Sequence, residues 1–418
     1  MRKILLCVLL LGLVFLFSGC PSLFEKPLKS IAFSSITGGG YHTIALDECG
    51  NVWAWGANLI GELGDGTNDD KSLPVQVKGP GGEGIMTGIT AIAAGYSHTV
   101  VLDENGNVWA WGANHAGQLG DGTNDHANTP VQVIASKGDG FLTGVTAIAA
   151  GGDFSVALKE DGSVWTWGHN YFGQLGIGTS GAGTNMNRPV RVKGPKGTFL
   201  EGIVAVAGGS SHSVALDEDG QVWTWGMNNY GQLGDGTNDD RSLPVQVKGP
   251  GGKGFLTNVT VVCAGGYHTV ALGEDGKARA WGYNASGQLG DGTDINKNTP
   301  VVVKAPEGEG ALAGMEKIFG GGHHSIALGQ DGSVWTWGNN NSGQLGDGTS
   351  VRKTRPVQVK GLGGDEFLEG IIAVAGGAQH TIALDLYGAI WTWGSNECGQ
   401  LGDGTDIYRN TPVQVEMP

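Results

Sequence analysis

The stretch HTVVLDENGNVWAWGANHAGQLGDGT, residues 98–123, decides the fold, because its parts recur seven times in the 418 residues of the chain. The Leu of a Gln-Leu-Gly or Glu-Leu-Gly tripeptide marks each copy, at Leu63, Leu119, Leu175, Leu233, Leu289, Leu345 and Leu401. Successive copies are 56 residues apart, except for one interval of 58. Repeats of this length are typical of solenoids and propellers.

Each unit contains four short runs with the composition of β-strands. In the second unit they are ITAIAAG (89–95), HTVVL, VWAWG and PVQV (130–133), rich in Val, Ile, Thr and Trp and alternating with period two. Asn105-Gly106 lies between HTVVL and VWAWG, where a tight hairpin needs residues that tolerate positive φ. No segment after the N-terminus has clear helical periodicity. The pattern predicts an all-β, seven-bladed β-propeller of four-stranded antiparallel blades over residues 31–418.

The sequence leaves open how the ring closes. The first unit begins at Ile31 and the last ends at Val415, so seven complete units are present. If the blades are offset from the sequence unit, the last PVQV run pairs with the first blade and latches the ring.

The motif WxWGxNxxGQLGDGT, preceded by GGxxHT, resembles the repeats of the family named after the regulator of chromosome condensation. The resemblance covers nearly the whole chain after residue 30, and all seven copies carry it. It implies a seven-bladed propeller. Function has to be argued from sites, because this fold hosts unrelated activities.

The N-terminus predicts export. Arg2-Lys3 precede the apolar run Ile4–Phe17, and Ser18-Gly19-Cys20 follow it. This order is that of a secretory signal peptide, and the Ser-Gly-Cys end resembles a bacterial lipoprotein signal. We therefore expect a signal over residues 1–19, an acylated Cys20 and a tether over 20–30, in an outer-membrane lipoprotein that faces the periplasm or the exterior. The alternatives are an ordinary signal peptide and an uncleaved anchor.

Composition excludes some partners. The net charge is −15 and the pI is about 5.0, which disfavours nucleic acid and anionic lipid surfaces. We expect a monomer held at the membrane only by its lipid. Cys49 lies in the turn before a VWAWG run and Cys398 in the loop after WTWG, at opposite ends of the strands, so we predict free thiols at Cys49, Cys263 and Cys398.

Two residue types recur at fixed positions of the unit. All 13 Trp lie in Trp-x-Trp pairs, whose only missing member is Arg279, and we interpret them as inter-blade packing. Carbohydrate stacking and light sensing, the latter known in a plant member of the family, are the alternatives. His occupies one position per unit in six units, with Phe154 in the third. Equivalent residues are spread around a propeller axis, so they do not suggest a single metal centre. We expect these His to bond nearby backbone.

Acidic loops are the one weak hint of a cofactor. The runs that begin at Asp65, Asp121 and Asp235 cluster the oxygen ligands that calcium prefers, but they lack the spacing of an EF-hand. Asp and Asn in such repeated turns usually cap the backbone. We predict no cofactor, with calcium as the alternative.

Departures from the repeat indicate where a partner binds. The third unit has Asp153-Phe154 in place of x-His, Ile177 in place of Asp, and a 179–189 loop three residues longer than in the other units. Its Asn-x-x-Gly loop carries Tyr171 and Phe172, and the corresponding loops of the fourth and first units carry Tyr230 and Leu59-Ile60. All these loops lie on one face by strand parity. An apolar, aromatic group there is typical of a protein-binding patch, with neutral drift in one blade as the alternative.

No nucleotide-binding, metalloprotease or serine-hydrolase motif is present, so we predict a protein that is not an enzyme. The favoured function is a lipid-anchored, extracytoplasmic module that binds a protein, as the family's secreted bacterial inhibitors of β-lactamase do. The first alternative is guanine-nucleotide exchange, the activity of the family's founding member. The second is binding of cell-envelope glycans.

Overall fold

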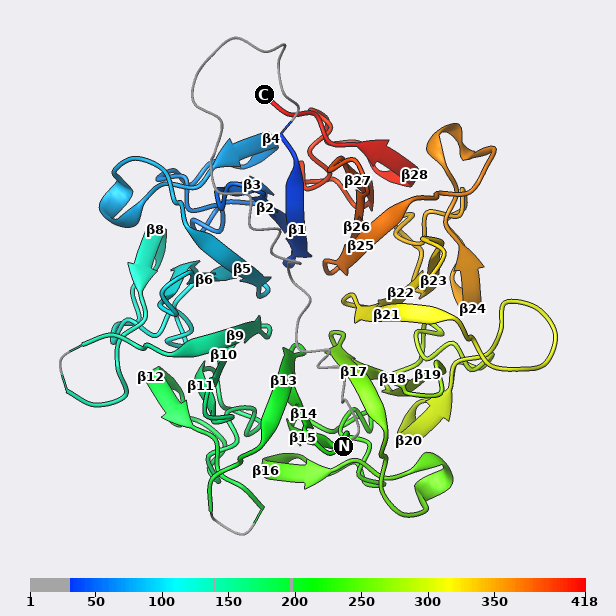
Figure 1. Cartoon of the computed structure of the whole chain (residues 1–418), viewed down its shortest axis with the longest axis horizontal. Helices are drawn as coiled ribbons and strands as arrows, with labels where there is room; N and C mark the ends of the chain where they lie inside the picture. The colour runs from blue at the N-terminus through cyan, green and yellow to red at the C-terminus, as the bar shows by residue number, and fades with distance from the viewer. Residues whose placement is uncertain (1–30, 139, 196–197) are drawn as a thin grey trace, which may run out of the picture.

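The computed structural model describes residues 31–138, 140–195 and 198–418, and Figure 1 shows them as seven blades around one axis. The predicted signal peptide, the acylated Cys20 and the tether lie outside the described residues. Each blade is a four-stranded antiparallel sheet whose strands follow chain order. The predicted seven-bladed propeller is therefore confirmed.

The blades contain 28 strands, and three short 3-10 helices lie between blades. In chain order the elements are β1 (Phe33–Gly38), β2 (His42–Asp47), β3 (Val52–Gly56), β4 (Lys71–Gln76), η1 (Pro80–Gly82), β5 (Ile89–Ala94), β6 (His98–Asp103), β7 (Val108–Gly112), β8 (Ala127–Gln132), β9 (Val145–Ala150), β10 (Phe154–Lys159), β11 (Val164–Gly168), β12 (Met186–Arg191), β13 (Ile203–Gly208), β14 (His212–Asp217), β15 (Val222–Gly226), β16 (Arg241–Gln246), η2 (Pro250–Gly252), β17 (Val259–Ala264), β18 (His268–Gly273), β19 (Ala278–Gly282), β20 (Lys297–Val302), β21 (Met315–Gly320), β22 (His324–Gly329), β23 (Val334–Gly338), β24 (Lys353–Gln358), η3 (Leu362–Gly364), β25 (Ile371–Gly376), β26 (His380–Asp385), β27 (Ile390–Gly394) and β28 (Arg409–Gln414).

The first strand of each blade lies nearest the axis and the fourth lies at the rim (Figure 1). A rim strand exposes one edge, which is a site for aggregation. Every rim strand carries a Pro near its centre, and Pro lacks the N–H that a further strand would need. These residues are Pro74, Pro130, Pro189, Pro244, Pro300, Pro356 and Pro412.

The ring closes without an offset. The last strand, β28, pairs with β27 inside its own blade, so the PVQV run does not latch onto the first blade. Side chains and loops join blade 7 to blade 1 instead. The Gln400 carbonyl oxygen accepts from Trp55 Nε1 at 3.0 Å and from Thr43 Oγ1 at 2.8 Å, and Gly404 N donates to Ser72 O at 3.0 Å.

Trp side chains form the same contact at the other junctions. The second Trp of each pair is fully buried, and six of the seven donate Nε1–H to a carbonyl of the preceding blade at 2.8–3.0 Å. Each hydrophobic core consequently spans two blades, as when Trp111 packs with Ile44 and Leu63. Inter-blade packing is thus confirmed for these seven Trp. The first Trp of each pair is half-buried, except for Trp53, which is buried.

The six repeated His also join neighbouring blades, so the prediction that they bond nearby backbone was wrong. Each Nε2 lies 2.8–3.2 Å from a Thr or Ser hydroxyl of the next blade. That hydroxyl donates its one proton to a backbone carbonyl oxygen at 2.8–3.1 Å. At five of these six junctions the same carbonyl also accepts the hydrogen bond of the Trp. The imidazole must therefore donate Nε2–H, which leaves Nδ1 as a buried acceptor without a partner among the described residues.

Backbone hydrogen bonds of 2.9–3.2 Å form a closed circle around the axis. There is one at each junction: Gly40 N to Tyr96 O, Tyr96 N to Gly152 O, Gly152 N to Gly209 O, Ser210 N to Gly266 O, Gly266 N to Gly322 O, Gly322 N to Gly377 O and Ala378 N to Gly39 O. Because the seventh bond is equivalent to the others, the junction between the chain ends is built like the internal ones.

A further prediction concerns thiols. Cys263 and Cys398 are free thiols, and Cys49 and Cys398 lie at opposite ends of the strands, as predicted. Across the part of the chain that the structure describes, no helix has the length and apolarity to span a membrane.

Candidate functional site

One face of the disc carries the long loops. The turns between first and second strands and the loops between third and fourth strands lie at the same strand ends, because neighbouring strands are antiparallel. Turn and loop also bond each other, since Ala57 N donates to Tyr41 O at 2.8 Å and Gln118 Nε2 donates to Asp153 Oδ1 at 3.3 Å. We call this surface the loop face. It contains all the residues predicted to bind a partner.

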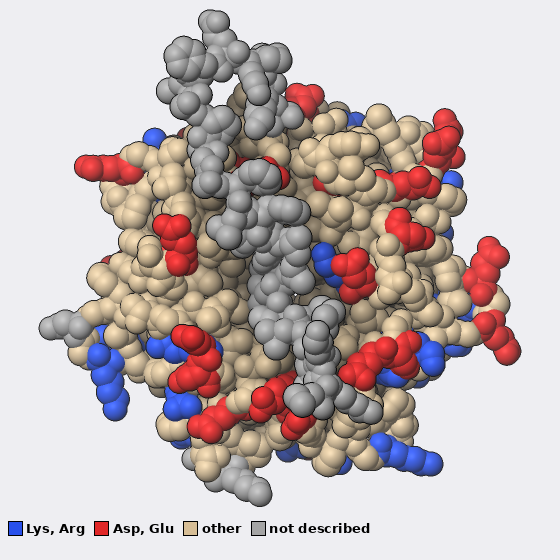
Figure 2. All heavy atoms as spheres, viewed as in Figure 1, with Lys and Arg blue, Asp and Glu red and all other residues tan. Residues whose placement is uncertain are grey.

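The loop face is strongly acidic. Its turns and loops carry sixteen Asp or Glu and only one Lys or Arg, Arg352. The sixteen are Glu62, Asp65, Asp69, Asp70, Asp121, Asp125, Asp153, Asp235, Asp239, Asp240, Asp291, Asp294, Asp347, Glu397, Asp403 and Asp406. Figure 2 shows acidic side chains spread around the disc, with basic side chains beside several of them.

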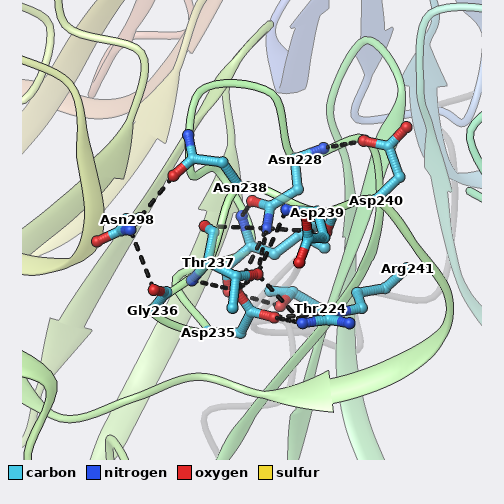
Figure 3. A network of polar contacts seen from close by, with 11 residues as sticks. Thr224, Asn228, Asp235, Gly236, Thr237, Asn238, Asp239, Asp240, Arg241 and Asn298 are labelled. Carbon is cyan, nitrogen blue, oxygen red and sulfur yellow. Dashed lines mark hydrogen bonds and ion pairs between the residues drawn. The ribbon is translucent and has the colours of Figure 1, made fainter.

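The Asp of each Gly-Asp-Gly-Thr turn belongs to the scaffold, as Asp235 illustrates (Figure 3). Its carboxylate accepts from Thr237 N, Thr237 Oγ1 and Asn228 Nδ2, and Arg241 lies 2.8 Å away. These hydrogen bonds and the Arg charge hold the pKa of Asp235 below its usual value despite burial. Internal partners thus occupy the oxygens that calcium would need. No group of three or more His, Cys, Asp and Glu among the described residues could hold a metal ion.

A second kind of Asp points into solvent. Asp239 and Asp240 are both exposed. Asp240 Oδ1 accepts from Asn228 N at 2.7 Å, whereas the Asp239 carboxylate has no hydrogen bond or ion pair with the described residues (Figure 3). The charges of Asp69 and Asp125 lie in equivalent exposed positions of blades 1 and 2.

Aromatic rings gather on the loop face over blades 4, 5 and 6. Tyr230, Tyr267, Tyr283 and His323 form one cluster, with ring centroids 4.8 Å apart for Tyr230 and Tyr283 and 5.7–6.4 Å for the other contacting pairs. All four side chains are half-buried. We call these four residues the aromatic cluster. The sequence did not predict it, because its members come from three different positions of the unit.

More aromatic residues lie towards the axis. Tyr96, which is 48% exposed, packs edge-on against Tyr41 at 5.8 Å. Asp153 approaches His115 to 3.9 Å, and its negative charge partly offsets the burial that lowers the pKa of His169. The acidic residues of this face, apart from Asp153, lie in the loops between third and fourth strands.

The predicted binding residues fall into separate groups. Tyr171 and Phe172 pack edge-on at 5.1 Å, and His169 stacks on Tyr171 at 6.4 Å. Tyr230 belongs to the aromatic cluster instead. Leu59 is 76% exposed and Ile60 is half-buried, in blade 1. Tyr267, Tyr283 and His323 were not predicted, because they stand at positions where the residue varies from unit to unit and no pattern marks them.

The departures of blade 3 have structural consequences. Phe154 is fully buried in the place of a His, and Ser213 of the next blade still donates to Gln174 O at 2.8 Å. With Ile177 in place of the Asp, Asn170 bonds Thr179 O and Thr184 Oγ1 of the longer loop. The scaffold thus absorbs both substitutions.

Seven contiguous blades, joined by Trp and His side chains and closed without a latch, make this chain a β-propeller built from one recurring sequence unit. The RCC1-like domain model matches residues 18–313, and the model of the regulator of chromosome condensation (RCC1) repeat matches residues 331–384 and 387–418. The chain belongs to the RCC1-like family.

Two comparisons illustrate this similarity. The ultraviolet-B receptor UVR8 of Arabidopsis thaliana is 31% identical over 91% of this chain and 81% of its own length. The crystal structure of human WBSCR16 matches with a TM-score of 0.73 at 24% identity, over 88% of this chain and 95% of that one.

A third similar protein binds partners of its own. Prp20p of Saccharomyces cerevisiae, whose crystal structure is described with its binding properties to Gsp1p and histones, has a TM-score of 0.69 at 24% identity. The match covers 92% of this chain and 87% of that one, and at this identity it shows a shared fold.

Proposed function

We propose that this protein is a non-catalytic, monomeric protein-binding module, held in the bacterial cell envelope by a lipid on Cys20, that engages its partner through the loop face. One observation carries the proposal. Aromatic rings that contact one another gather on this face, in the aromatic cluster, at Tyr171-Phe172 and at Tyr41-Tyr96, and Leu59 on the same face is 76% exposed. Aromatic residues on an exposed surface are typical of interface hot spots.

Family membership supports the same function. Prp20p, a structural relative, is described by its binding to two kinds of protein. A closed propeller offers a rigid platform for such binding, because the circle of backbone hydrogen bonds fixes the turns that carry Tyr41, Tyr96 and Tyr267. A rigid surface loses little conformational entropy when a partner binds.

Capture from envelope extracts tests the binding function. The chain from Ile31, which contains every junction described above, serves as bait, and bound proteins are identified by mass spectrometry. The matched variant carries Tyr171→Ala, Phe172→Ala and Tyr230→Ser, where Ser is the residue that blades 5 and 6 have in place of Tyr230. A protein bound by the parent and lost in the variant supports the proposal. Enrichment of glycans alone, or of no protein, contradicts it.

Metabolic labelling tests the anchor separately. Cells that express the full-length chain are fed an alkyne fatty acid, and the protein is purified and conjugated to a dye. We expect label on the parent chain and none on the Cys20→Ala variant. An unlabelled parent chain would contradict lipidation and leave an ordinary signal peptide or an uncleaved anchor.

A further inference from the structure

We propose that the loop face selects a basic protein segment, and that the aromatic cluster receives an Arg or Lys side chain of that segment by cation–π contact while the exposed Asp residues attract its charges. This inference rests on the proposed function and names the chemistry of the partner.

The aromatic cluster is not required by the fold. At the position of Tyr283, blades 1 and 2 carry Ala57 and Ala113, and at that of Tyr267, blades 2 and 4 carry Ser97 and Ser211. Those blades form the same strands and the same junctions although they have no aromatic ring at these positions. The four rings of the cluster nevertheless come from blades 4, 5 and 6 and meet in one place.

Charge decides which partner suits this surface. The basic residues that follow the loops are committed internally, since Arg241, Lys353 and Arg409 pair with buried Asp residues at 2.8–3.1 Å. Exposed Asp239 and Asp240 lie in the same loop as Tyr230 and keep their negative charge available. A cation over a Tyr ring gains from the ring quadrupole, and neighbouring carboxylates add Coulomb attraction.

The same charge disfavours other occupants. In a symmetric dimer through the loop face, two surfaces with sixteen acidic residues each would meet, and like charges repel across an interface. Nucleic acid and anionic lipid are disfavoured for the same reason. A basic protein segment supplies both the cation for the rings and the counter-charge for the acidic loops.

Short peptides test the proposal directly. Fluorescein-labelled Arg-Gly-Arg-Gly-Arg-Gly-Arg, its Glu counterpart and its Gln counterpart are titrated with the full-length protein in detergent, and anisotropy is followed at 25 and 200 mM NaCl. We expect the Arg peptide to bind, with weaker binding at the higher salt, and the Glu peptide not to bind. The Lys version should bind more weakly than the Arg version, because guanidinium also stacks on aromatic rings.

Two variants with residues taken from other blades locate the site. Tyr283→Ala together with Tyr267→Ser should weaken binding of the Arg peptide by about 2- to 30-fold, the range for one cation–π contact of about 0.5–2 kcal/mol. Asp239→Asn with Asp240→Asn should weaken it and flatten its salt dependence. The control is Phe255→Leu, which removes a half-exposed ring under Lys248 on the opposite face and should leave the affinity unchanged.

Each outcome decides the proposal. No binding of the Arg peptide at 25 mM NaCl, equal binding of the Glu peptide, or an affinity unchanged in both loop-face variants would overturn it. If capture from extracts yields a partner that depends on Tyr230 but has no basic segment, this inference fails and the proposed function stands. If the Arg peptide binds through Tyr267 and Tyr283 but no envelope protein is captured, the surface chemistry stands and the proposed function fails.

Discussion

Acid should destabilise this propeller through its buried His, and exchanging His98 for Phe tests the reason. Burial lowers the pKa of His98 to about 3 and that of His42 to about 4. The other four repeated His are lowered to about 3 or 4 in the same way. Because each Nε2 donates to a hydroxyl and Nδ1 has no hydrogen-bond partner among the described residues, the folded protein holds these imidazoles in the neutral form.

The size and the sign of the effect follow from proton linkage. In the unfolded chain a His has a pKa of about 6.5, so below that pH the unfolded state binds more protons than the folded state. Stability is therefore full above pH 6.5, falls as the pH is lowered, and reaches its minimum below the folded-state pKa values. At pH 5 each His lowers the free energy of unfolding by about 2 kcal/mol, and all six lower it by about 12 kcal/mol. This sum is comparable to the whole stability of a typical domain.

Blade 3 supplies the substitution for the test. Phe154 occupies the His position there, fully buried, and the neighbouring Ser213 keeps its bond to Gln174 O. His98→Phe should consequently fold. At pH 7.5 the variant lacks one hydrogen bond, which lowers its free energy of unfolding by about 0.5–1.5 kcal/mol relative to the parent. At pH 5 the variant has no imidazole to protonate on unfolding, so it regains about 2 kcal/mol of unfolding free energy relative to the parent.

Urea denaturation at pH 7.5, 6 and 5, followed by Trp fluorescence, measures this difference. The difference in unfolding free energy between variant and parent should shift by about 2 kcal/mol between pH 7.5 and 5 in favour of the variant. The carboxylates with lowered pKa values, such as Asp403, lose their contribution only below about pH 4, outside this window. A difference that is the same at all three pH values would refute the assignment of acid sensitivity to these His.

Three further predictions concern single positions. Gly377→Ala should destabilise the ring by about 1–3 kcal/mol in thermal unfolding, because the added Cβ would lie 2.0 Å from His380 Cε1 and 2.7 Å from Gly39 O, and an unchanged midpoint would contradict the packing of this turn. Asp235→Ala should lower the free energy of unfolding by about 1–3 kcal/mol, because it removes several hydrogen bonds and the ion pair with Arg241. Asp239→Ala in the same loop should change it by less than about 0.5 kcal/mol. Equal effects of the two substitutions in urea denaturation would argue against two kinds of Asp. Burial raises the pKa of the Cys263 thiol to about 12, so iodoacetamide at pH 8 should modify Cys263 only after unfolding, and rapid labelling of the native protein would show that the thiol is accessible.

The repeat could be predicted from the sequence because its signals are local. Strand alternation, the Asn105-Gly106 hairpin turn and the interval between Leu63 and Leu119 each depend on neighbouring residues or on the identity of the copies. Strand parity likewise placed the loops of Tyr171 and Tyr230 on one face, as the structure has them. Fold class, blade number and the face of the predicted patch were therefore available without tertiary information.

The partner of each residue could not be predicted in the same way. His98 bonds Ser155, which lies 57 residues further along the chain, and no pattern within one unit shows that the two meet across a junction. The closure of the ring was equally undetermined, because a latched and an unlatched propeller have the same strands.

The aromatic cluster shows what only the tertiary structure decided. Tyr230, Tyr267 and Tyr283 come from two sequence units and occupy three unrelated positions within them, so they share no spacing. They meet because the ring places a turn of one blade beside the loops of its neighbours. The sequence by itself determined the seven-bladed scaffold, since each blade is specified locally. The proposed binding surface was decided by the packing of blade on blade, which brings together side chains that the repeat leaves free to vary.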